Sequence, residues 1–320
     1  MREGRRPDRA GVLRALEKLG KIVPPTPLMA GEVAGRTVWL KAESLQPMGA
    51  FKLRGAWHRL TDLDEAGRAA GVVAFSSGNH AQGVAWAARA LGIAATIVMP
   101  ADSPAKKLDN TCALGAEVIL YDRMTESREA IAARIAAERG AVVVPSFDDP
   151  WIVEGQGTAG LEAVAQLAVL DRPAPDRIVT CCGGGGLAGG LALACPEAEI
   201  VVVEPEGWDD MTRSLAAGEI LPVAPNPPPT ACDALQTLRV AELTFGILRD
   251  RNARGVAVSE AETGAAMRWA FEQLRLVLEP GGAVALAALL AGKVEPTDRT
   301  LVILSGGNVD ATTFTRMTGL

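Results

Sequence analysis

The sequence has little of the chemistry that most enzymes use for proton transfer, because its 320 residues include only two histidines and one tyrosine. Histidine is the most frequent general acid or base in enzymes, so this scarcity shifts attention to lysine, serine and a bound cofactor. The five cysteines form no C-x-x-C pair and lie in no secretory context. We therefore expect small buried thiols rather than disulfides or a zinc site.

Long hydrophobic runs and an excess of positive charge are also missing. The longest apolar run, Ala283 to Ala291, is too short to cross a bilayer, and no apolar stretch follows the basic residues from Met1 to Arg9. The net charge of −6 at pH 7 argues against nucleic acid or an anionic membrane as the main partner. We expect a cytoplasmic globular protein, with 48% hydrophobic residues to fill a substantial core.

Apolar runs alternate with helical patterns along the chain, which predicts an α/β protein whose parallel sheets are covered by helices. The predicted strands are residues 37–41, 72–75, 94–99, 117–121, 142–144, 177–181, 199–203, 255–258 and 300–304. The predicted helices are residues 81–91, 104–114, 125–139, 158–170, 187–194, 209–217, 242–249, 260–274, 281–290 and 309–317.

A run of four glycines, residues 183–186, follows one of the predicted strands. Residues without a Cβ let successive backbone N–H groups close around a phosphate monoester at the start of the next helix. The run also fits a dinucleotide fingerprint, because a G-x-G-x-x-G spacing begins at Gly184 and Glu204 lies at the end of the next strand. A tight turn that binds no ligand is the third interpretation.

Two further segments have chemistry of their own. Residues 76–80, Ser-Ser-Gly-Asn-His, follow a predicted strand and offer helix-capping side chains and N–H groups that suit a carboxylate. Lys52 is surrounded by apolar residues, so we expect it to be desolvated and to have a lowered pKa. Such an amine is a nucleophile for aldehydes. Without a ligand, the first segment is a capped helix start and Lys52 a solvated surface residue.

Six segments, in order along nearly the whole chain, form a specific combination. They are Gly-Ala-Phe-Lys-Leu-Arg-Gly-Ala at 49–56, Ser-Ser-Gly-Asn-His at 76–80, Gly-Gln-Gly-Thr at 155–158, the four glycines at 183–186, Val-Leu-Glu-Pro-Gly-Gly-Ala at 277–283 and Leu-Ser-Gly-Gly-Asn-Val-Asp at 304–310. With them the chain resembles the fold-type II pyridoxal-phosphate enzymes, in particular the branch of threonine and serine dehydratases and serine racemases. The resemblance implies a tryptophan synthase beta-like architecture with two parallel-sheet domains.

The resemblance also implies roles for individual residues. Lys52 binds the aldehyde of pyridoxal phosphate covalently, Phe51 packs beside the ring, Asn79 hydrogen-bonds the ring hydroxyl and Ser305 faces the pyridine nitrogen. The residues implied to bind the phosphate are Gly183, Gly184, Gly185 and Gly186. Those implied to surround the substrate carboxylate are Ser76, Ser77, Asn79 and His80.

A neutral hydroxyl at Ser305 makes the pyridine ring a weaker electron sink than a carboxylate would, which favours β-elimination. The predicted function is a dehydratase, or ammonia-lyase, that converts L-threonine or L-serine to a 2-oxo acid and ammonia, with Lys52 removing the α-proton. Serine racemase and threo-3-hydroxyaspartate ammonia-lyase share these motifs and remain alternatives. A racemase would use Ser77 as the acid/base on the opposite face. A dinucleotide-binding oxidoreductase is a distant alternative, and a cofactor carrier would require an unreactive Lys52.

The resemblance gives Glu204 a second interpretation. With Asp210 and the backbone carbonyl of Trp208, it matches a divalent-cation site whose oxygen ligands suit magnesium or calcium. Acidic residues at a helix start, without a metal, are the alternative.

We expect two domains with the active site in the cleft between them. The large domain comprises residues 1–64 and 150–320, and a small inserted domain comprises residues 65–149. Closure of the small domain over the substrate would exclude water. The resemblance implies a homo-oligomer, usually a dimer, with a small amino acid as the other partner.

Overall fold

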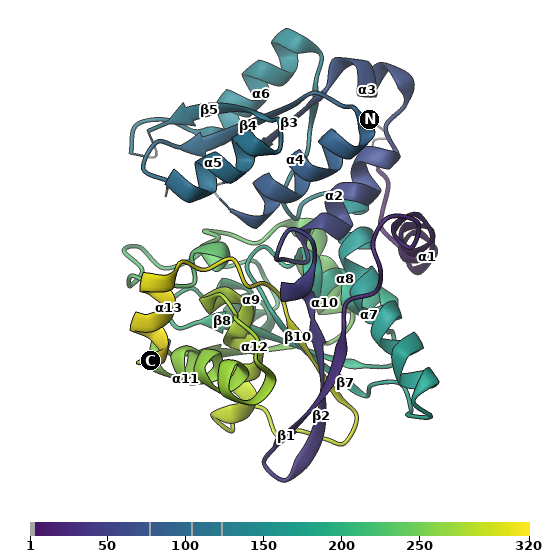
Figure 1. Cartoon of the computed structure of the whole chain (residues 1–320), viewed down its shortest axis with the longest axis vertical. Coiled ribbons are helices and arrows are strands. Elements are labelled where there is room, and N and C mark those ends of the chain that lie inside the picture. Colours follow the sequence, from purple (N-terminus) through teal and green to yellow (C-terminus); the bar gives the residue numbers. More distant parts are fainter. Residues whose placement is uncertain (1–3, 77, 104, 123) are drawn as a thin grey trace.

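The computed structural model describes residues 4–76, 78–103, 105–122 and 124–320 and contains two sheets (Figure 1). The six-stranded sheet has the order β1 (Leu28–Val33), β2 (Arg36–Ala42), β10 (Thr300–Leu304), β7 (Arg177–Cys181), β8 (Glu199–Pro205), β9 (Arg254–Val258). Strands β1 and β2 are antiparallel, and the other neighbours are parallel. The central strand β10, Thr-Leu-Val-Ile-Leu, is buried throughout, as expected for a strand covered on both faces.

Helices surround this larger sheet. Helix α12 (Pro280–Leu290) packs along the four strands from β7 to β10, α8 (Gly186–Ala194) packs against β7 and β8, and α9 (Asp210–Ala217) against β8 and β9. The other helical elements in this part are α1 (Arg9–Leu19), the 3-10 turn η1 (Glu43–Leu45), α7 (Pro150–Val169), the 3-10 turn η2 (Asp233–Leu235), α10 (Glu242–Asp250), α11 (Glu260–Trp269), the π-helical turn η3 (Ala270–Leu274) and α13 (Ala311–Thr318).

The smaller sheet is entirely parallel, in the order β5 (Glu117–Tyr121), β4 (Ala95–Pro100), β3 (Val72–Phe75), β6 (Val142–Val143). Its helices are α3 (Glu65–Ala70), α4 (Asn79–Leu91), α5 (Ala105–Ala113) and α6 (Arg128–Arg139). Helices α4 and α6 pack against β3 and β4. Within the described ranges, no helix is both long enough and apolar enough to cross a membrane.

Helix α2 (Lys52–Thr61) lies between the two sheets, packing against α4 on one side and α7 on the other (Figure 1). It meets α7 at close range, because a Cβ on Gly155 would lie 2.6 Å from the carbonyl oxygen of Arg54. On its other side, Leu53, Trp57 and Leu60 belong to the core of the smaller sheet. The strands of that sheet all lie within the predicted small domain, but the predicted boundary at residue 64 divides a shared core.

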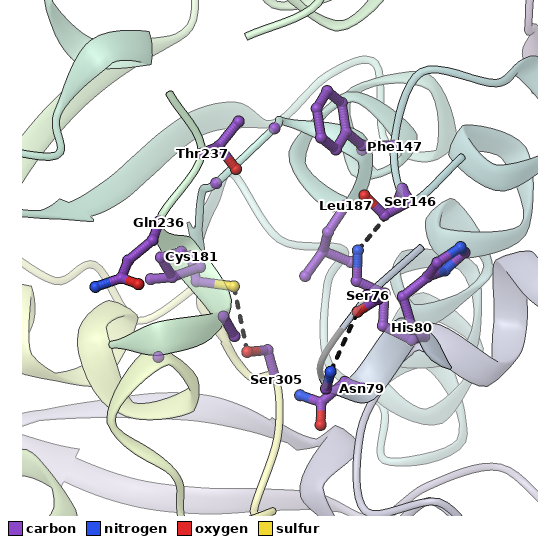
Figure 2. Close-up of a pocket in the computed structure, with 18 of the residues that line it drawn as sticks. Ser76, Asn79, His80, Ser146, Phe147, Cys181, Leu187, Gln236, Thr237 and Ser305 are labelled. Atoms are coloured by element: carbon purple, nitrogen blue, oxygen red, sulfur yellow. Dashed lines mark hydrogen bonds between the residues drawn. The ribbon is translucent and has the colours of Figure 1, made fainter. Parts of the chain in front are cut away.

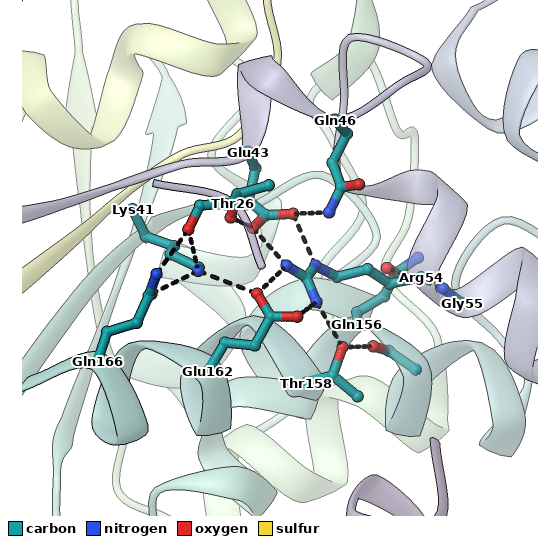
Figure 3. A network of polar contacts seen from close by, with 11 residues as sticks. Thr26, Lys41, Glu43, Gln46, Arg54, Gly55, Gln156, Thr158, Glu162 and Gln166 are labelled. Carbon is teal, nitrogen blue, oxygen red and sulfur yellow. Dashed lines mark hydrogen bonds and ion pairs between the residues drawn. The ribbon is translucent and has the colours of Figure 1, made fainter. Parts of the chain in front are cut away.

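Arg54 is the centre of a buried ion network that ties α2 to its neighbours (Figure 3). Its guanidinium donates to Glu43 at 2.7 and 2.8 Å and to Glu162 on α7 at 2.8 and 2.6 Å. Lys41 Nζ lies 3.0 Å from the Glu162 carboxylate. Burial raises the pKa of Glu43, but the charge and hydrogen bonds of Arg54 outweigh this effect and leave the pKa below its ordinary value. Glu43 is therefore ionised.

The predicted α/β class with two parallel sheets is confirmed, and most predicted elements differ from the observed ones by a few residues. Three helices, α1, α2 and α3, were not among the predicted ones. Other details were wrong as well. The antiparallel strand β1 was not expected, and α7 begins at Pro150 rather than at residue 158, because Asp149 caps the N–H of Ile152 at 3.0 Å. The helix predicted at 260–274 is α-helical only to Trp269 and ends in a π-helical turn.

Replacement of Arg54 by methionine should lower the free energy of unfolding by about 3–5 kcal/mol, because it leaves the buried Glu43 without its cation. Urea unfolding measures the change. Arg134, which pairs with Glu138 on the exposed face of α6, provides a matched control. Arg134→Met should change stability by less than about 1 kcal/mol. Equal losses in the two variants would contradict a special role for the buried network.

Candidate active site

A pocket lies where the two sheets meet, beside the carboxyl ends of β3, β7 and β10. Ligands of parallel α/β proteins commonly bind at such ends. The predicted site residues that line the pocket are Phe51, Lys52, Ser76, Asn79, His80, Gly183, Gly184, Gly185, Gly186 and Ser305. Ser77, the remaining predicted member of this group, lies outside the described residues. The fold thus brings together segments that are more than 200 positions apart in the sequence (Figure 2).

Lys52 begins α2, and its amine is held without a carboxylate partner among the described residues. Nζ donates to the backbone carbonyl of Ser146 at 2.9 Å and lies 5.2 Å from the ring centroid of Phe51. Burial lowers the pKa of Lys52 from an ordinary 10.5 to about 8, against a smaller opposite effect of Cys181. A useful fraction of the amine is therefore neutral and nucleophilic near neutral pH.

The four glycines connect β7 to α8, whose first N–H groups have no acceptor within the helix. Side chains would not fit here. A Cβ on Gly184 would collide with the ring of Phe147, and Gly185 has φ +86° with Met211 Cε 2.8 Å from the place of a Cβ. A backbone without side chains, together with a helix N-terminus, forms the kind of cradle that binds phosphate.

Ser305 follows β10 and is nearly fully buried. Its carbonyl accepts from the N–H of Phe51 at 3.1 Å, and its Oγ accepts from the Cys181 thiol at 3.2 Å (Figure 2). Burial raises the pKa of Cys181 to about 11, so the thiol keeps its proton and can donate. The hydroxyl hydrogen of Ser305 is then available to an acceptor in the pocket, such as a pyridine nitrogen.

The turn after β3 brings three of the predicted carboxylate-binding residues, Ser76, Asn79 and His80, to the pocket. Ser76 Oγ accepts from the N–H of Gly78 at 3.2 Å, and Asn79 begins α4. The amide of Asn79 donates to Glu279 at 2.6 Å and accepts from Asn308 at 2.8 Å. The first N–H groups of α4 lack acceptors within their own helix and suit a carboxylate.

For contact with a substrate carboxylate, the backbone N–H of His80 is better suited than its imidazole ring. Nε2 lies 2.9 Å from the carbonyl oxygen of Val144, which can only accept, so Nε2 carries the hydrogen. Burial, and to a smaller extent the charge of Lys52, lowers the pKa of His80 to about 3. The imidazole is therefore neutral and already bonded. A contact with a substrate carboxylate would come from the backbone N–H.

Glu279 and Gly281 also line the pocket; they lie in the recognised segment 277–283 but were assigned no role. Sequence reasoning missed other lining residues: Phe75, Arg128, Ser146, Phe147, Cys181, Leu187 and residues 233–237. Cys181 could have been found, because it ends the strand just before the glycine run. Arg128 gave no signal, since an arginine at a helix start is usually solvated. The fold places it beside the pocket, with its guanidinium carbon 5.6 Å from the ring centroid of Phe75.

Glu204, near the end of β8, is fully buried and accepts from the N–H groups of Met211 at 3.1 Å and Thr212 at 2.7 Å. The acidic group that a dinucleotide fingerprint would offer to ribose is thus bound to the first turn of α9. This arrangement argues against the dinucleotide interpretation. Burial raises the pKa of Glu204 to about 8.

Asp210, the first residue of α9, is also buried, and burial raises its pKa to about 6. Neither of its carboxylate oxygens has a hydrogen-bond partner within the described ranges, although the N–H of Val240 is close enough to stabilise the charge. Trp208 donates its indole N–H to Pro228 at 2.8 Å. No cluster of three acidic, histidine or cysteine side chains suited to a metal occurs among the described residues, so a cation here would need backbone oxygens.

The pocket fits pyridoxal phosphate in its separate parts. Lys52 is a desolvated amine for the aldehyde, the glycine run leaves a phosphate cradle that any Cβ would narrow, and Ser305 is a neutral donor for the ring nitrogen. These three features lie in one cavity.

Comparison with known proteins agrees with this chemistry. The family model "Pyridoxal-phosphate dependent enzyme" matches residues 21–306. An L-threo-3-hydroxyaspartate ammonia-lyase of Pseudomonas sp is 41% identical over 93% of this chain and 94% of its own length. The structure of maize serine racemase has a TM-score of 0.89 at 34% identity and covers 98% of this chain and 97% of its own. The structure of serine racemase from Dictyostelium discoideum has a TM-score of 0.87 at 33% identity, with coverages of 95% and 99%.

The lowered pKa of Lys52 predicts how cofactor-free protein reacts with pyridoxal phosphate. The neutral amine is the reactive form, so attachment should be slow below pH 7 and should rise with pH to a midpoint near 8. Borohydride trapping at each pH, followed by peptide mapping, measures the label on Lys52. Lys52→Arg should lose that label. A midpoint close to the ordinary value of 10.5 would show that the amine is solvated.

Proposed function

The chain belongs to the family of pyridoxal-phosphate-dependent enzymes, and we propose that it is an ammonia-lyase for L-hydroxyamino acids. The observation that carries the proposal is the pairing of Lys52, with its lowered pKa, and the neutral Ser305–Cys181 couple in one pocket. The substrate would be L-threonine, L-serine or L-threo-3-hydroxyaspartate. Each loses its β-hydroxyl and amino groups and yields a 2-oxo acid and ammonia.

Bound pyridoxal phosphate supplies an electron sink for the charge that develops at the α-carbon of the substrate. Lys52 Nζ accepts the α-proton, which its pKa of about 8 permits near neutral pH. The N–H groups at the start of α4 and the hydroxyl of Ser76 hold the substrate carboxylate. Ser305 donates to the ring nitrogen without adding negative charge, and the glycine run holds the phosphate.

Serine racemisation remains the second candidate, because it begins with the same removal of the α-proton. It requires a proton donor on the face opposite Lys52, the role that we assigned to Ser77 from the sequence. Structures of serine racemases are among the similar proteins, so the shared fold does not separate the two reactions. Conversion of L-serine to D-serine, measured in parallel with pyruvate release and in Ser77→Ala, distinguishes them.

Arg128 favours a dicarboxylic substrate. Its Nε is bound to Glu129 at 2.8 Å, whereas its Nη groups have no partner within the described ranges. Arg128 lines the pocket, and its guanidinium carbon lies 5.6 Å from the ring centroid of Phe75. A second carboxylate on the β-carbon, as in 3-hydroxyaspartate, is the group that such a cation recognises.

We also propose that Glu204, Asp210 and the carbonyl of Trp208 bind magnesium or calcium. The support is the pair of buried acids with raised pKa values. No side chain among the described residues is bonded to the Asp210 carboxylate, and a hard cation would stabilise the ionised form of both acids in this buried position.

A homodimer is part of the same proposal, supported by the large apolar side chains of Phe271 and Val277, which are 39% and 45% exposed. We place the protein in the cytoplasm, where a reducing environment keeps thiols such as the buried Cys181, Cys182, Cys195 and Cys232 free.

The function is tested by the release of 2-oxo acid from L-threonine, L-serine and L-threo-3-hydroxyaspartate. Arg128→Gln should lower kcat/KM for hydroxyaspartate about tenfold to hundredfold, because the charge-assisted bonds to its second carboxylate are lost. The value for L-serine should change less than about threefold. Arg134→Gln, a change of the same kind on the exposed face of α6, is the matched control and should alter neither substrate.

Two results would contradict parts of this proposal. A wild type that releases 2-oxo acid from none of the three substrates would remove the ammonia-lyase assignment. Equal losses of kcat/KM for serine and hydroxyaspartate in Arg128→Gln would show that this residue maintains the structure of the pocket and does not bind the second carboxylate of the substrate.

Cation binding should raise the melting temperature of chelator-treated protein when magnesium or calcium is added, because a ligand of the folded state stabilises it. Asp210→Asn should abolish the rise. Asp210 is a better test than Glu204, whose loss would also uncap α9. Asp209→Asn, at the neighbouring and more exposed acid, is the control and should keep the rise. An equal rise in the Asp210 variant and in wild type would show that Asp210 does not bind the cation and is only an acidic residue at a helix start.

A further inference from the structure

The amide of Asn79 is held by two side chains from the opposite sheet. Its Nδ2 donates to Glu279 Oε1 at 2.6 Å, and its Oδ1 accepts from Asn308 Nδ2 at 2.8 Å. Asn79 begins α4 on the smaller sheet, whereas Glu279 precedes α12 and Asn308 follows β10 on the larger one. Both hydrogen bonds therefore cross between the sheets at the edge of the pocket.

The chemistry of the two ends fixes the direction of this relay. Asn308 Nδ2 also lies 2.8 Å from the carbonyl oxygen of Met48, which can only accept, so this atom of Asn308 is a nitrogen and a donor. At the other end, the Glu279 oxygen receives the N–H of Asn79. The amide of Asn79 therefore has one permitted orientation. One of its two N–H groups is bound to Glu279, and the second has no acceptor among the described residues and remains for a ligand in the pocket that Asn79 lines.

Asn308 also organises the loop that leads to Lys52. Its side chain donates to the carbonyl of Met48, and the backbone N–H of the adjacent Gly307 donates to the carbonyl of Gly49 at 2.8 Å. Gly49 has φ +69°, and a Cβ there would collide with the amide of Asn308. One side chain thus contacts the loop before the reactive lysine and the first residue of α4.

We propose that Asn308 is a positioning residue that presents the free N–H of Asn79 to the ring hydroxyl of the cofactor. The inference rests on the proposed function, which puts pyridoxal phosphate in the pocket. A hydrogen bond donated to an oxygen favours its ionised form and lowers its pKa. Asn308 therefore affects the ionisation of the ring hydroxyl indirectly, through Asn79. Because the hydrogen bonds of Asn79 cross between the two sheets, this ionisation also depends on the relative position of the sheets.

A purely structural role for Asn308 would affect folding but not the ionisation of bound cofactor, so the two roles can be separated. Asn308→Asp is nearly isosteric and removes both donated hydrogen bonds. In the holoenzyme, the pH at which the visible absorbance of the cofactor changes should rise by about one unit in this variant. Affinity for pyridoxal phosphate should fall about tenfold, the value of one charge-assisted hydrogen bond.

Asn308→Ala removes the same bonds without adding a charge and decides the question if the aspartate variant does not fold. Asn226→Asp, in the exposed proline-rich loop, is the matched control and should leave the absorbance titration unchanged. In an Asn79→Ala background, Asn308→Ala should produce no further shift in the titration, because the relay has already lost its middle member.

The outcomes separate the inference from the function on which it rests. Wild-type protein that binds no pyridoxal phosphate would overturn the proposed function. Wild-type protein that binds it, with an unchanged absorbance titration in Asn308→Ala, would overturn the role of Asn308 alone. A shift of the same size in the Asn79→Ala background would also overturn it, since the effect would then bypass Asn79.

Discussion

The position of α2 depends on one buried ion network. Arg54 pairs with Glu43 before the helix and with Glu162 on α7, and Lys41 balances the second carboxylate. Removing four charges from water costs free energy that a well-packed apolar contact would not, so the network is a poor source of net stability. It instead fixes the position of α2 relative to α7, because a guanidinium bonded to two carboxylates requires one geometry. A purely apolar contact would permit several relative positions of the two helices. Lys52 is two residues away and takes its position from that geometry.

This position of α2 places Lys52 where a reactive amine can persist. Burial lowers the pKa of Lys41 as well, but Glu162 and Glu43 favour its charged form and offset part of that effect. Lys52 faces the carbonyl of Ser146 instead, and burial lowers its pKa to about 8. The same region of the fold therefore contains one lysine paired for structure and another left without a counter-charge for chemistry. The second arrangement opposes stability, as functional sites commonly do.

The site residues recognised in the sequence all lie in local patterns that can be identified without a structure or an alignment. Glycine runs, a lysine among apolar neighbours and polar turns after apolar strands are local patterns, and the structure places these segments in one pocket. Arg128 reaches the pocket only through the fold, which brings its guanidinium beside the ring of Phe75, more than fifty positions away in the sequence. The start of α7 was missed for a different reason: Asp149 and Pro150 form a helix-start signal that lies outside the apolar period on which the prediction relied.

Elimination and racemisation differ in the step that follows removal of the α-proton. In elimination the β-hydroxyl leaves, whereas in racemisation a proton returns to the α-carbon from the opposite face. Ser305 is bonded to a thiol whose pKa is about 11. In the proposed site it would add no negative charge beside the pyridine nitrogen, so the ring would withdraw electrons only moderately. Charge that develops at the α-carbon is then best relieved by departure of the β-hydroxyl, and a return proton must arrive quickly to compete. In the proposed site Lys52 can return a proton only to its own face, which restores the L-substrate. Under the proposed function, the balance between the two reactions would therefore depend on a proton donor at the face opposite Lys52, and not on the residues that hold the cofactor. Similarity to an ammonia-lyase and to a serine racemase is compatible with this view, because both reactions would begin with the same removal of the α-proton.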